Sequence, residues 1–191
     1  GTRWDNVGAM RNRGVEINVS ADVLRIKDFT WNVNANVSYN KNEITELYNG
    51  ITEYVASDTG RMVAVGHPLG EFYLNRYAGV NPTNGDALWY TKDGEITTEY
   101  NESDKVMLGK THEAPWQGGF GTTLSWQGFS LSAQFTWVAD RWMLNNDRVF
   151  QESNGLFSAY NQSKRMLYDR WKKPGDVTDI PRYGVTPQLD S

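Results

Sequence analysis

The amino-acid sequence predicts an all-β fold built from antiparallel β-hairpins. Four runs of residues alternate between apolar and polar side chains, which is the period of a β-strand with two unlike faces. Short breaks join the runs in pairs, at about residues 14–40 and 118–138, and long polar segments, at about 41–117 and 139–191, follow each pair. Strands of this kind build either an arc of a transmembrane β-barrel with long extracellular loops or a soluble β-sandwich.

The first hairpin combines VEINVSADV, Val15 to Val23, with FTWNVNANVSYN, Phe29 to Asn40. In the first run every second residue is apolar, so one face is expected to carry Val15, Ile17, Val19, Ala21 and Val23. The segment LRIKD is expected to be a break that leads into the second run. There the apolar set starts at Phe29, and the alternate positions hold small polar residues, mostly asparagine.

The second hairpin joins GGFGTTLSW, Gly118 to Trp126, to FSLSAQFTWV, which begins at Phe129. Gln127 and Gly128 lie between them and are typical of a two-residue hairpin turn. Both runs again place aromatic and aliphatic residues on one face and Ser, Thr or Gln on the other.

The long polar segments carry weaker signals. Within residues 41–117, GEFYLNRYAGV and ALWYT are expected to pair as short strands. Later in the chain, SKRMLYDRW, Ser163 to Trp171, is expected to form one short helix, because Met166, Leu167 and Trp171 fall near one face.

Three features favour the membrane barrel over the sandwich. The polar faces are almost uncharged and rich in Asn, which is a poor strand former on a solvated sheet. Rings lie mainly near strand ends around an aliphatic middle, the layout of two aromatic girdles. Short turns alternate with long excursions, as in outer-membrane barrels. The apolar face is then expected to meet lipid and the asparagine face the lumen, while a soluble carbohydrate-binding sandwich stays the alternative.

Four strands cannot close a barrel, so the chain is expected to be an arc taken from a longer protein. Its two free strand edges and its bare apolar face would be open to pairing in isolation. We therefore expect the isolated chain to self-associate.

Composition excludes several classes of function. The formal charge of −4 and the pI near 5.2 argue against a nucleic-acid partner. The absence of Cys excludes disulfides and thiolate metal sites. His67 and His112 have no ligand-spaced partner, and the acidic loop at 90–104 lacks the spacing of a calcium loop. We expect no metal, no cofactor and no enzymatic activity.

Aromatic residues of the long segments are the candidate ligand contacts, because rings beside amide and carboxylate groups bind sugars or peptides by stacking and hydrogen bonding. The candidates are Trp89, Tyr90, Trp116 and Trp142, with Asn145, Asp147 and Arg148 beside the last of these. For each ring the alternative role is packing within a loop or contact with a partner protein.

Four segments also resemble one family, in order along the chain. NVGAMRNRGVEI, Asn6 to Ile17, resembles a segment that opens a strand in TonB-dependent receptors. VGHPLGEFYLNRYAGVNPTNG, Val65 to Gly85, is similar to a stretch of their SusC/RagA-like branch. VMLGKTHEAPWQGGFGTTLSWQGFSLSAQF resembles a hairpin of that branch, and the residues from Arg170 to Arg182 resemble its last long loop.

The resemblance implies a part of the C-terminal half of a barrel of roughly 22 strands around an N-terminal plug. Such receptors import large nutrients, typically glycans or peptides, across the outer membrane of Gram-negative bacteria. A SusD-like surface lipoprotein caps the barrel, and the TonB complex supplies energy. The long loops are then expected to be extracellular and the apolar face to contact outer-membrane lipid.

Overall fold

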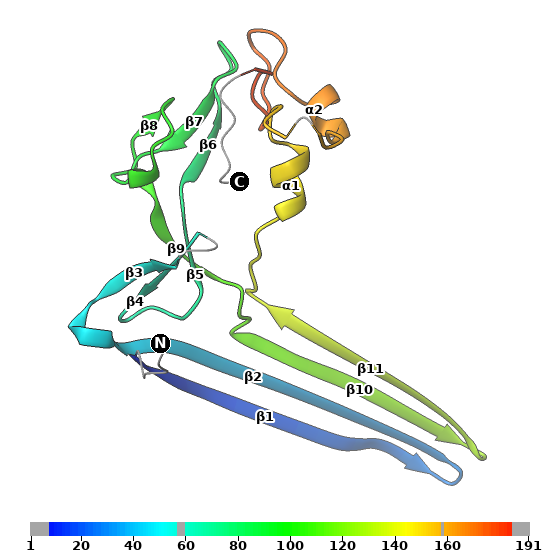
Figure 1. The fold of residues 1–191 in the computed structure, drawn as a ribbon. Helices are drawn as coiled ribbons and strands as arrows, with labels where there is room; N and C mark the ends of the chain where they lie inside the picture. The colour runs from blue at the N-terminus through cyan, green and yellow to red at the C-terminus, as the bar shows by residue number, and fades with distance from the viewer. Residues whose placement is uncertain (1–7, 57–59, 158, 185–191) are drawn as a thin grey trace. The chain divides into compact units, whose positions relative to one another are not determined.

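The computed structural model describes residues 8–56, 60–157 and 159–184. The chain divides into two compact units, residues 1–71 with 109–142 and residues 72–108 with 143–191. Regular structure is mostly antiparallel β-sheet, as predicted, with short helices α1 (Asn146–Gln151) and α2 (Lys164–Tyr168) (Figure 1). Within the described ranges, no helix combines the length and the apolar character needed to cross a bilayer.

The first unit contains a sheet of four long strands in the order β1-β2-β10-β11 (Figure 1). The strands are β1 (Gly8–Ile26), β2 (Phe29–Leu47), β10 (Trp116–Trp126) and β11 (Phe129–Ala139). All neighbours in this sheet are antiparallel, and β2 pairs with β10, so the two hairpins lie side by side. The ladder between β1 and β2 extends beyond the predicted range of residues 14–40. The added pairs include charged and polar residues.

The register gathers the apolar residues of all four strands on one face. Phe120 of β10 lies opposite Ala35 of β2 and Phe135 of β11, and the two phenyl rings stack with centroids 4.8 Å apart. One step along, Gly121 lies between Asn34 and Gln134 on the other face. The sheet therefore has one continuous apolar face and one amide-rich face.

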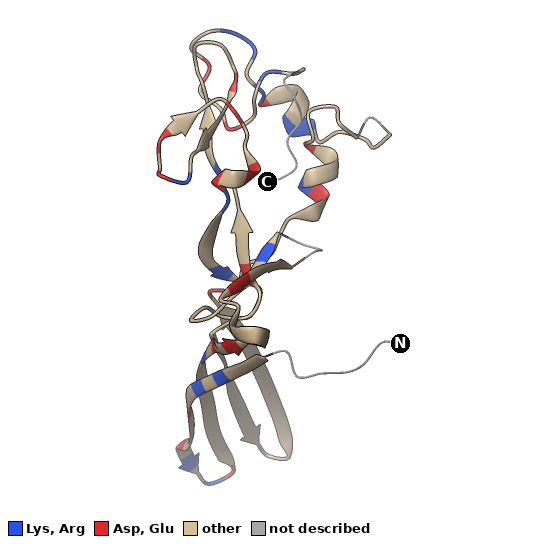
Figure 2. Ribbon diagram, turned by 60° about the vertical axis from the view of Figure 1, so that its left-hand side comes forward, with Lys and Arg blue, Asp and Glu red and all other residues tan. Residues whose placement is uncertain are grey.

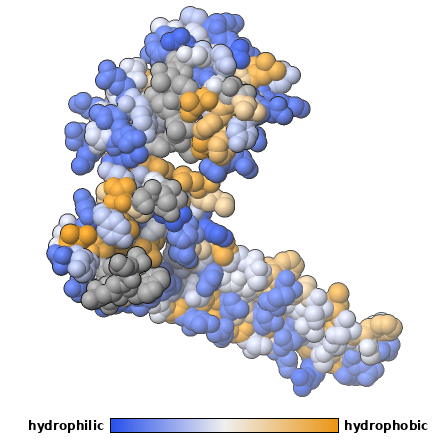
Figure 3. Space-filling model, in the orientation of Figure 1, coloured by the Kyte–Doolittle hydropathy of each residue, from blue (hydrophilic) through white to orange (hydrophobic). Residues whose placement is uncertain are grey.

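The apolar face of this sheet is bare. Phe129 is 78% exposed, Leu131 67% and Val15 64%. Hydrophobic residues show at the surface along the long strands (Figure 3), and charged residues are sparse along their middle (Figure 2). A β-sandwich would bury such a face against a second sheet, and the described residues supply none.

A β-bulge corrects the expected break after Val23. Asp22 pairs with Asn32, and the next pair is Leu24 with Trp31, so Val23 is an extra residue in β1. Residues 24–26 then continue the strand, and the turn contains Lys27 and Asp28. The prediction of a five-residue break was wrong, because alternation counted from the sequence cannot show a residue that the ladder skips.

A second sheet has the order β3-β4-β5-β9, with β3 (Glu53–Ala56), β4 (Arg61–Ala64), β5 (Glu71–Leu74) and β9 (Val106–Thr111). The turn η1 (Tyr48–Gly50) connects β2 to this region. Ile44 and Leu47, near the end of β2, pack against Val63 of β4 and form a small buried cluster. The first unit therefore has its hydrophobic core beside the long sheet's end, not on its apolar face.

The second unit is built around the sheet β6-β7-β8, with β6 (Arg76–Val80), β7 (Ala87–Tyr90) and β8 (Ile96–Thr97). The antiparallel pairing of β6 with β7 agrees with the predicted pairing for residues 76–80 only. The first part of the predicted segment is β5, which belongs to the other sheet. η2 (Glu102–Asp104) follows β8. The predicted helix at 163–171 is shorter than expected: α2 ends at Tyr168, and Met166 is buried while Leu167 is 56% exposed.

Polar contacts hold the C-terminal part of the second unit together. Arg165 pairs with Asp179 at 2.6 Å and with Glu152 at 3.1 Å. Partial burial raises the pKa of Asp179, but the hydrogen bond and charge of Arg165 outweigh it and hold that pKa below its usual value. Burial raises the pKa of the Tyr77 phenol, which donates to the carbonyl oxygen of Asp179 at 3.0 Å. These contacts tie the segment around Asp179 to β6 and α2.

Gly85 is expected to be intolerant of a side chain. It has φ +79°, and a Cβ there would lie 2.5 Å from the ring of Trp171, which itself donates to the carbonyl oxygen of Pro82. We expect Gly85→Ala to destabilise the second unit by about 2–4 kcal/mol, the sum of backbone strain and overpacking. Hydrogen exchange of the β6 and β7 amides measures the loss.

Gly94→Ala is the matched control for this substitution. Gly94 also has a positive φ, +91°, but a Cβ there would meet nothing within 4 Å. It therefore reports backbone strain alone, about 1 kcal/mol. Equal effects of the two substitutions would show that the Trp171 contact contributes nothing.

Candidate functional site

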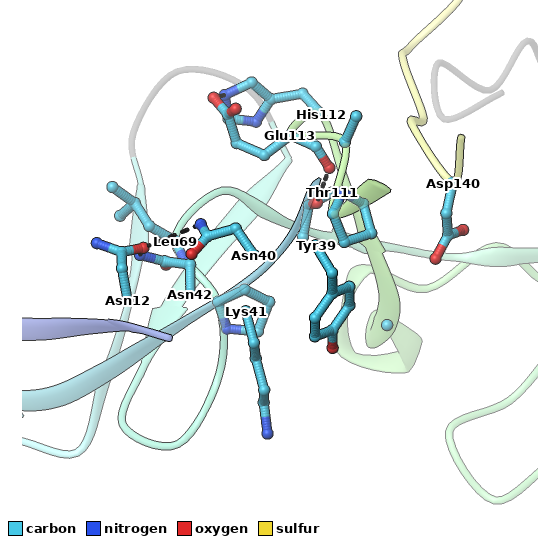
Figure 4. A pocket seen from close by; sticks show the side chains of 14 residues that line it. Asn12, Tyr39, Asn40, Lys41, Asn42, Leu69, Thr111, His112, Glu113 and Asp140 are labelled. Carbon is cyan, nitrogen blue, oxygen red and sulfur yellow. Dashed lines mark hydrogen bonds and ion pairs between the residues drawn. The ribbon is translucent and has the colours of Figure 1, made fainter. Parts of the chain in front are cut away.

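A pocket of about 380 Å³, with several polar side chains in its lining, is in the first unit, at the end of the long sheet remote from its two-residue turns. Asparagines of β1 and β2 line one side, and residues 68–69, 111–115 and Asp140 line the others (Figure 4). The amide of Asn40 donates to the carbonyl oxygen of Pro115 at 2.9 Å, which fixes the segment before β10 beside β2. The pocket thus gathers parts of the chain that are distant in sequence.

An asparagine cluster forms the β-sheet side of the pocket. The side-chain oxygen of Asn12 accepts from Asn42 at 2.9 Å and from Asn40 at 3.3 Å. The oxygen of Asn42 accepts from the backbone amide of Leu69 at 2.8 Å, so the cluster also fixes the loop before β5. The arrangement presents amide groups in defined positions, which suits hydroxyl or peptide groups of a ligand.

His112 and Glu113 form another side of the pocket. His112 Nε2 lies 3.2 Å from a carboxylate oxygen of Glu113, and the ring packs on Gly70, where a Cβ would come within 2.5 Å. The Nδ1 atom of His112 is buried without a hydrogen-bond partner in the described structure. The hydroxyl of Thr111 donates to the carbonyl oxygen of Glu113 at 2.9 Å. His112 thus lines this pocket.

Trp142 is a candidate ring that does not itself line this pocket but is bonded to residues that do. Its indole N–H donates to Asp140, which lines the pocket, at 2.9 Å, and its backbone amide donates to the carbonyl oxygen of Thr111 at 2.9 Å. Lys110 Nζ lies 4.3 Å from the ring centroid, a cation–π contact. The side chain is still 46% exposed. Trp142 is therefore a fixed ring with free surface, as a stacking platform requires.

Trp116 and Trp89 have other surroundings. Trp116 lies opposite Tyr39 on the apolar face of the long sheet, with ring centroids 4.5 Å apart, so it faces away from the asparagines. Trp89 is only 5% exposed and packs between Tyr77 and Tyr100, at 5.1 and 5.2 Å. Trp89 therefore has the alternative role that was considered for each ring, which is packing within the protein.

The other candidates lie in the second unit and make local contacts. Tyr90 carries Arg76 over its ring at 5.4 Å. Asn145 caps α1 by accepting from the amide of Arg148 at 3.3 Å, and Arg148 pairs with Glu152 at 2.8 Å. Asp147 occupies the first turn of α1, where a carboxylate favours the helix dipole. These polar residues support the helix and do not line the pocket described above.

The sequence reasoning missed the pocket residues Asn12, Asn42, Asp140 and His112. One signal could have found Asn42: the polar positions of FTWNVNANVSYN continue in register from Asn40 to this residue. Among the described residues, no group of three His, Asp or Glu side chains has the arrangement of a metal site.

The chain is similar to proteins of one kind. No family model matches it. It is 27% identical to the TonB-dependent receptor P39 of Formosa agariphila over 162 residues, which is 85% of this chain and 14% of that receptor. It is 31% identical over 119 residues to the TonB-dependent receptor SusC of Bacteroides thetaiotaomicron, covering 55% of this chain and 12% of SusC.

Solved structures extend the likeness to the whole chain. A structure of the RagAB peptide transporter matches 99% of this chain at 34% identity with a TM-score of 0.90. Over nearly all of its length, the chain has the sequence and fold of part of a SusC-like TonB-dependent receptor. It spans 22% of the matched RagAB chain, and thus about a fifth of its length. TonB-dependent receptors are outer-membrane transport proteins and not enzymes, in agreement with the expectation drawn from the sequence.

Proposed function

We propose that this part of a SusC-like receptor forms barrel wall and extracellular loops of an importer for large nutrients, glycans or peptides. The observation that carries the proposal is the single-layer sheet with one bare apolar face and one amide-rich face. In water an exposed apolar surface of that extent is costly, whereas in a bilayer it replaces lipid–lipid contacts at little cost.

The length of the apolar band supports this placement. Rings at Phe29 and Tyr39 bound it on β2, ten residues apart, or about 33 Å along a strand. At the tilt of roughly 40° that is usual in membrane barrels, the band is about 25 Å high. This height equals the apolar belt of outer-membrane barrels.

The amide-rich face then lines the lumen, with the pocket at its outer end. The turns at Lys27–Asp28 and Gln127–Gly128 have the length of periplasmic turns, so the opposite end, with the asparagine cluster, faces the cell exterior. Trp142 and the asparagines are the residues that we propose to contact the nutrient as it enters. Tyr90, Asn145, Asp147 and Arg148 are proposed as further nutrient contacts in the loops.

The whole receptor is proposed to act with two partners. The matched relatives are named TonB-dependent, which supports energy supply by the TonB complex. The likeness to SusC and to RagAB supports a SusD-like surface lipoprotein as the cap, and a C-terminal-half position of this arc in the barrel is proposed with it. RagAB carries peptides by name, so peptides are tested beside glycans.

Cells that produce the whole receptor are expected to accumulate a labelled peptide mixture or a labelled oligosaccharide mixture, and receptor-deleted cells are not. Trp142→Ala is expected to reduce the initial uptake rate about fivefold to tenfold, because the ring offers roughly 1 kcal/mol of stacking. Trp142→Phe keeps a ring and is the matched control. Receptor levels in outer membranes are measured in parallel by immunoblot.

Either of two results would contradict these assignments. Uptake of neither mixture by cells with the intact receptor would reject nutrient import of this class. Equal uptake by the Ala and Phe variants and the unaltered receptor would reject Trp142 as a contact while leaving import in place.

A further inference from the structure

A pair of basic residues lies on the apolar face of the long sheet, just beyond its aromatic edge. Arg13 of β1 lies directly opposite Lys41 of β2. The neighbouring pair on the same face is Val15 with Tyr39, and Tyr39 contacts Trp116. The register thus adds two cations to the face that carries the apolar band.

Figure 4 shows the separation of the two faces at this point of β2. Tyr39 and Lys41 point to one side of the strand, whereas Asn40 and Asn42 point to the other, toward the pocket. Lys41 is among the residues around the pocket, but its ammonium group points to the same side of the strand as the Tyr39 ring, away from Asn40 and Asn42.

The cations are only partly neutralised within the chain. Glu43 lies 3.8 Å from Lys41 Nζ and 3.6 Å from an Arg11 nitrogen, both long for ion pairs. In the part of the chain that the structure describes, Arg13 has no carboxylate within ion-pair distance, and three cations share one nearby carboxylate. The next carboxylate on this face, Glu46, lies further along β2, opposite Ala9.

Two like charges placed directly opposite each other in a sheet are destabilising. An anion bound between them removes this repulsion. Arginine offers a planar fork that binds two oxygens of a phosphate, and lysine adds a compact charge. Arg13 and Lys41 together are therefore suited to a phosphate group.

The depth of Arg13 and Lys41 in the membrane indicates that the phosphate belongs to a lipid headgroup. Arg13 and Lys41 lie two residues beyond Val15 and Tyr39, about 7 Å along the strand and about 5 Å along the membrane normal at the usual tilt. This is the depth of lipid headgroups next to an aromatic girdle. Beneath the cations, Val15 and Ile17 are 64% and 52% exposed and are free to contact acyl chains.

We propose that Arg13 and Lys41 bind the phosphate of an anionic lipid headgroup in the outer leaflet. One amphipathic molecule then contacts both parts of this face, its phosphate on the cations and its chains on the apolar band. The inference rests on the proposed orientation of the sheet, with the two-residue turns on the inner side. It is independent of which nutrient the receptor carries.

Native mass spectrometry of the whole receptor, released from detergent after titration with diphosphorylated lipid A, tests the proposal. Each basic residue near an anionic membrane surface contributes about fivefold in affinity at moderate ionic strength. The double variant Arg13→Gln/Lys41→Gln is therefore expected to bind this lipid about 25-fold more weakly. High salt is expected to reduce the difference.

Two controls make the result decisive. Arg25→Gln/Lys27→Gln removes the same charge at the turn end of the same hairpin and is expected to leave the affinity within twofold. Lipid A without phosphates is expected to bind the unaltered receptor as weakly as the double variant. Equal losses in both double variants, or equal binding of the two lipids, would overturn the proposal.

Uptake and folding are followed separately. The thermal unfolding midpoint in detergent confirms that each variant is folded, and Arg13→Lys, which keeps the charge, is expected to keep most of the binding. Displacement of the lipid by millimolar inorganic phosphate would overturn the assignment to a lipid. Failure of nutrient import in the unaltered receptor would affect the proposed function but not this measurement.

Discussion

Ala35→Arg is expected to lower the free energy of unfolding of the receptor in phospholipid vesicles by about 2–4 kcal/mol. This is the usual penalty for arginine at the bilayer midplane. Ala35 lies between Val19 of β1 and Phe120 of β10, midway along the apolar band. An arginine there has its charge far from either headgroup layer. Denaturant titration of the vesicle-inserted receptor measures the loss.

Asn34→Arg is the control, because the adjacent residue faces the amide-rich side. Asn34 lies opposite Ser20 and Gly121, in the face assigned to the lumen. There the guanidinium stays hydrated, and the expected cost is below about 1 kcal/mol. A larger loss from Asn34→Arg than from Ala35→Arg would reverse the assignment of the two faces.

Removal of the Glu71 carboxylate is expected to loosen β9. Glu71 is 2% exposed, accepts from the backbone amide of Gly109 at 2.6 Å and lies 2.9 Å from His67 Nδ1. Hydrogen bonds to charged groups contribute about 1.5–3 kcal/mol, and Glu71→Ala removes the acceptor of the Gly109 N–H. Hydrogen exchange of peptides covering β9 is expected to accelerate about 30-fold, which is the corresponding change for about 2 kcal/mol.

The Gln variant separates the hydrogen bond from the charge. Glu71→Gln keeps an oxygen for Gly109 and offers an N–H to His67, so exchange is expected to change less than about fivefold. A 30-fold acceleration in Glu71→Gln as well would show that the negative charge, and not the acceptor, holds this strand. Unchanged exchange in Glu71→Ala would show that the contact contributes no local stability.

The long hairpins could be predicted because their physics is local. Strict alternation in FTWNVNANVSYN and a Gln127–Gly128 turn determine strand, face and partner without knowledge of any distant residue. The pairing of β2 with β10 is different, since residues 48–115 separate the two strands in the sequence. Nothing local in either strand specifies the other as its neighbour.

The candidate site was predicted less well for the same reason. Trp142 was recognised by its type, but its partners Lys110 and Asp140 come from β9 and from the residue after β11. Trp89, like Trp142, is a tryptophan in a polar segment, yet it is buried. The rings of Tyr77 and Tyr100 pack against it. Ring type alone could not separate a packed tryptophan from an exposed one.

The bulge at Val23 decides which residues of β1 are assigned to lipid and which to the lumen. Before Val23, the odd-numbered residues of β1 lie on the apolar face. After Val23, the even-numbered residues Leu24 and Ile26 lie on that face. If the alternation is counted through Val23 without a break, Leu24 and Ile26 are wrongly assigned to the lumen face and Arg25 to the lipid face. A count that skips Val23 restores the faces, so the lipid-facing residues of β1 are assigned correctly only when this residue is left out of the alternation.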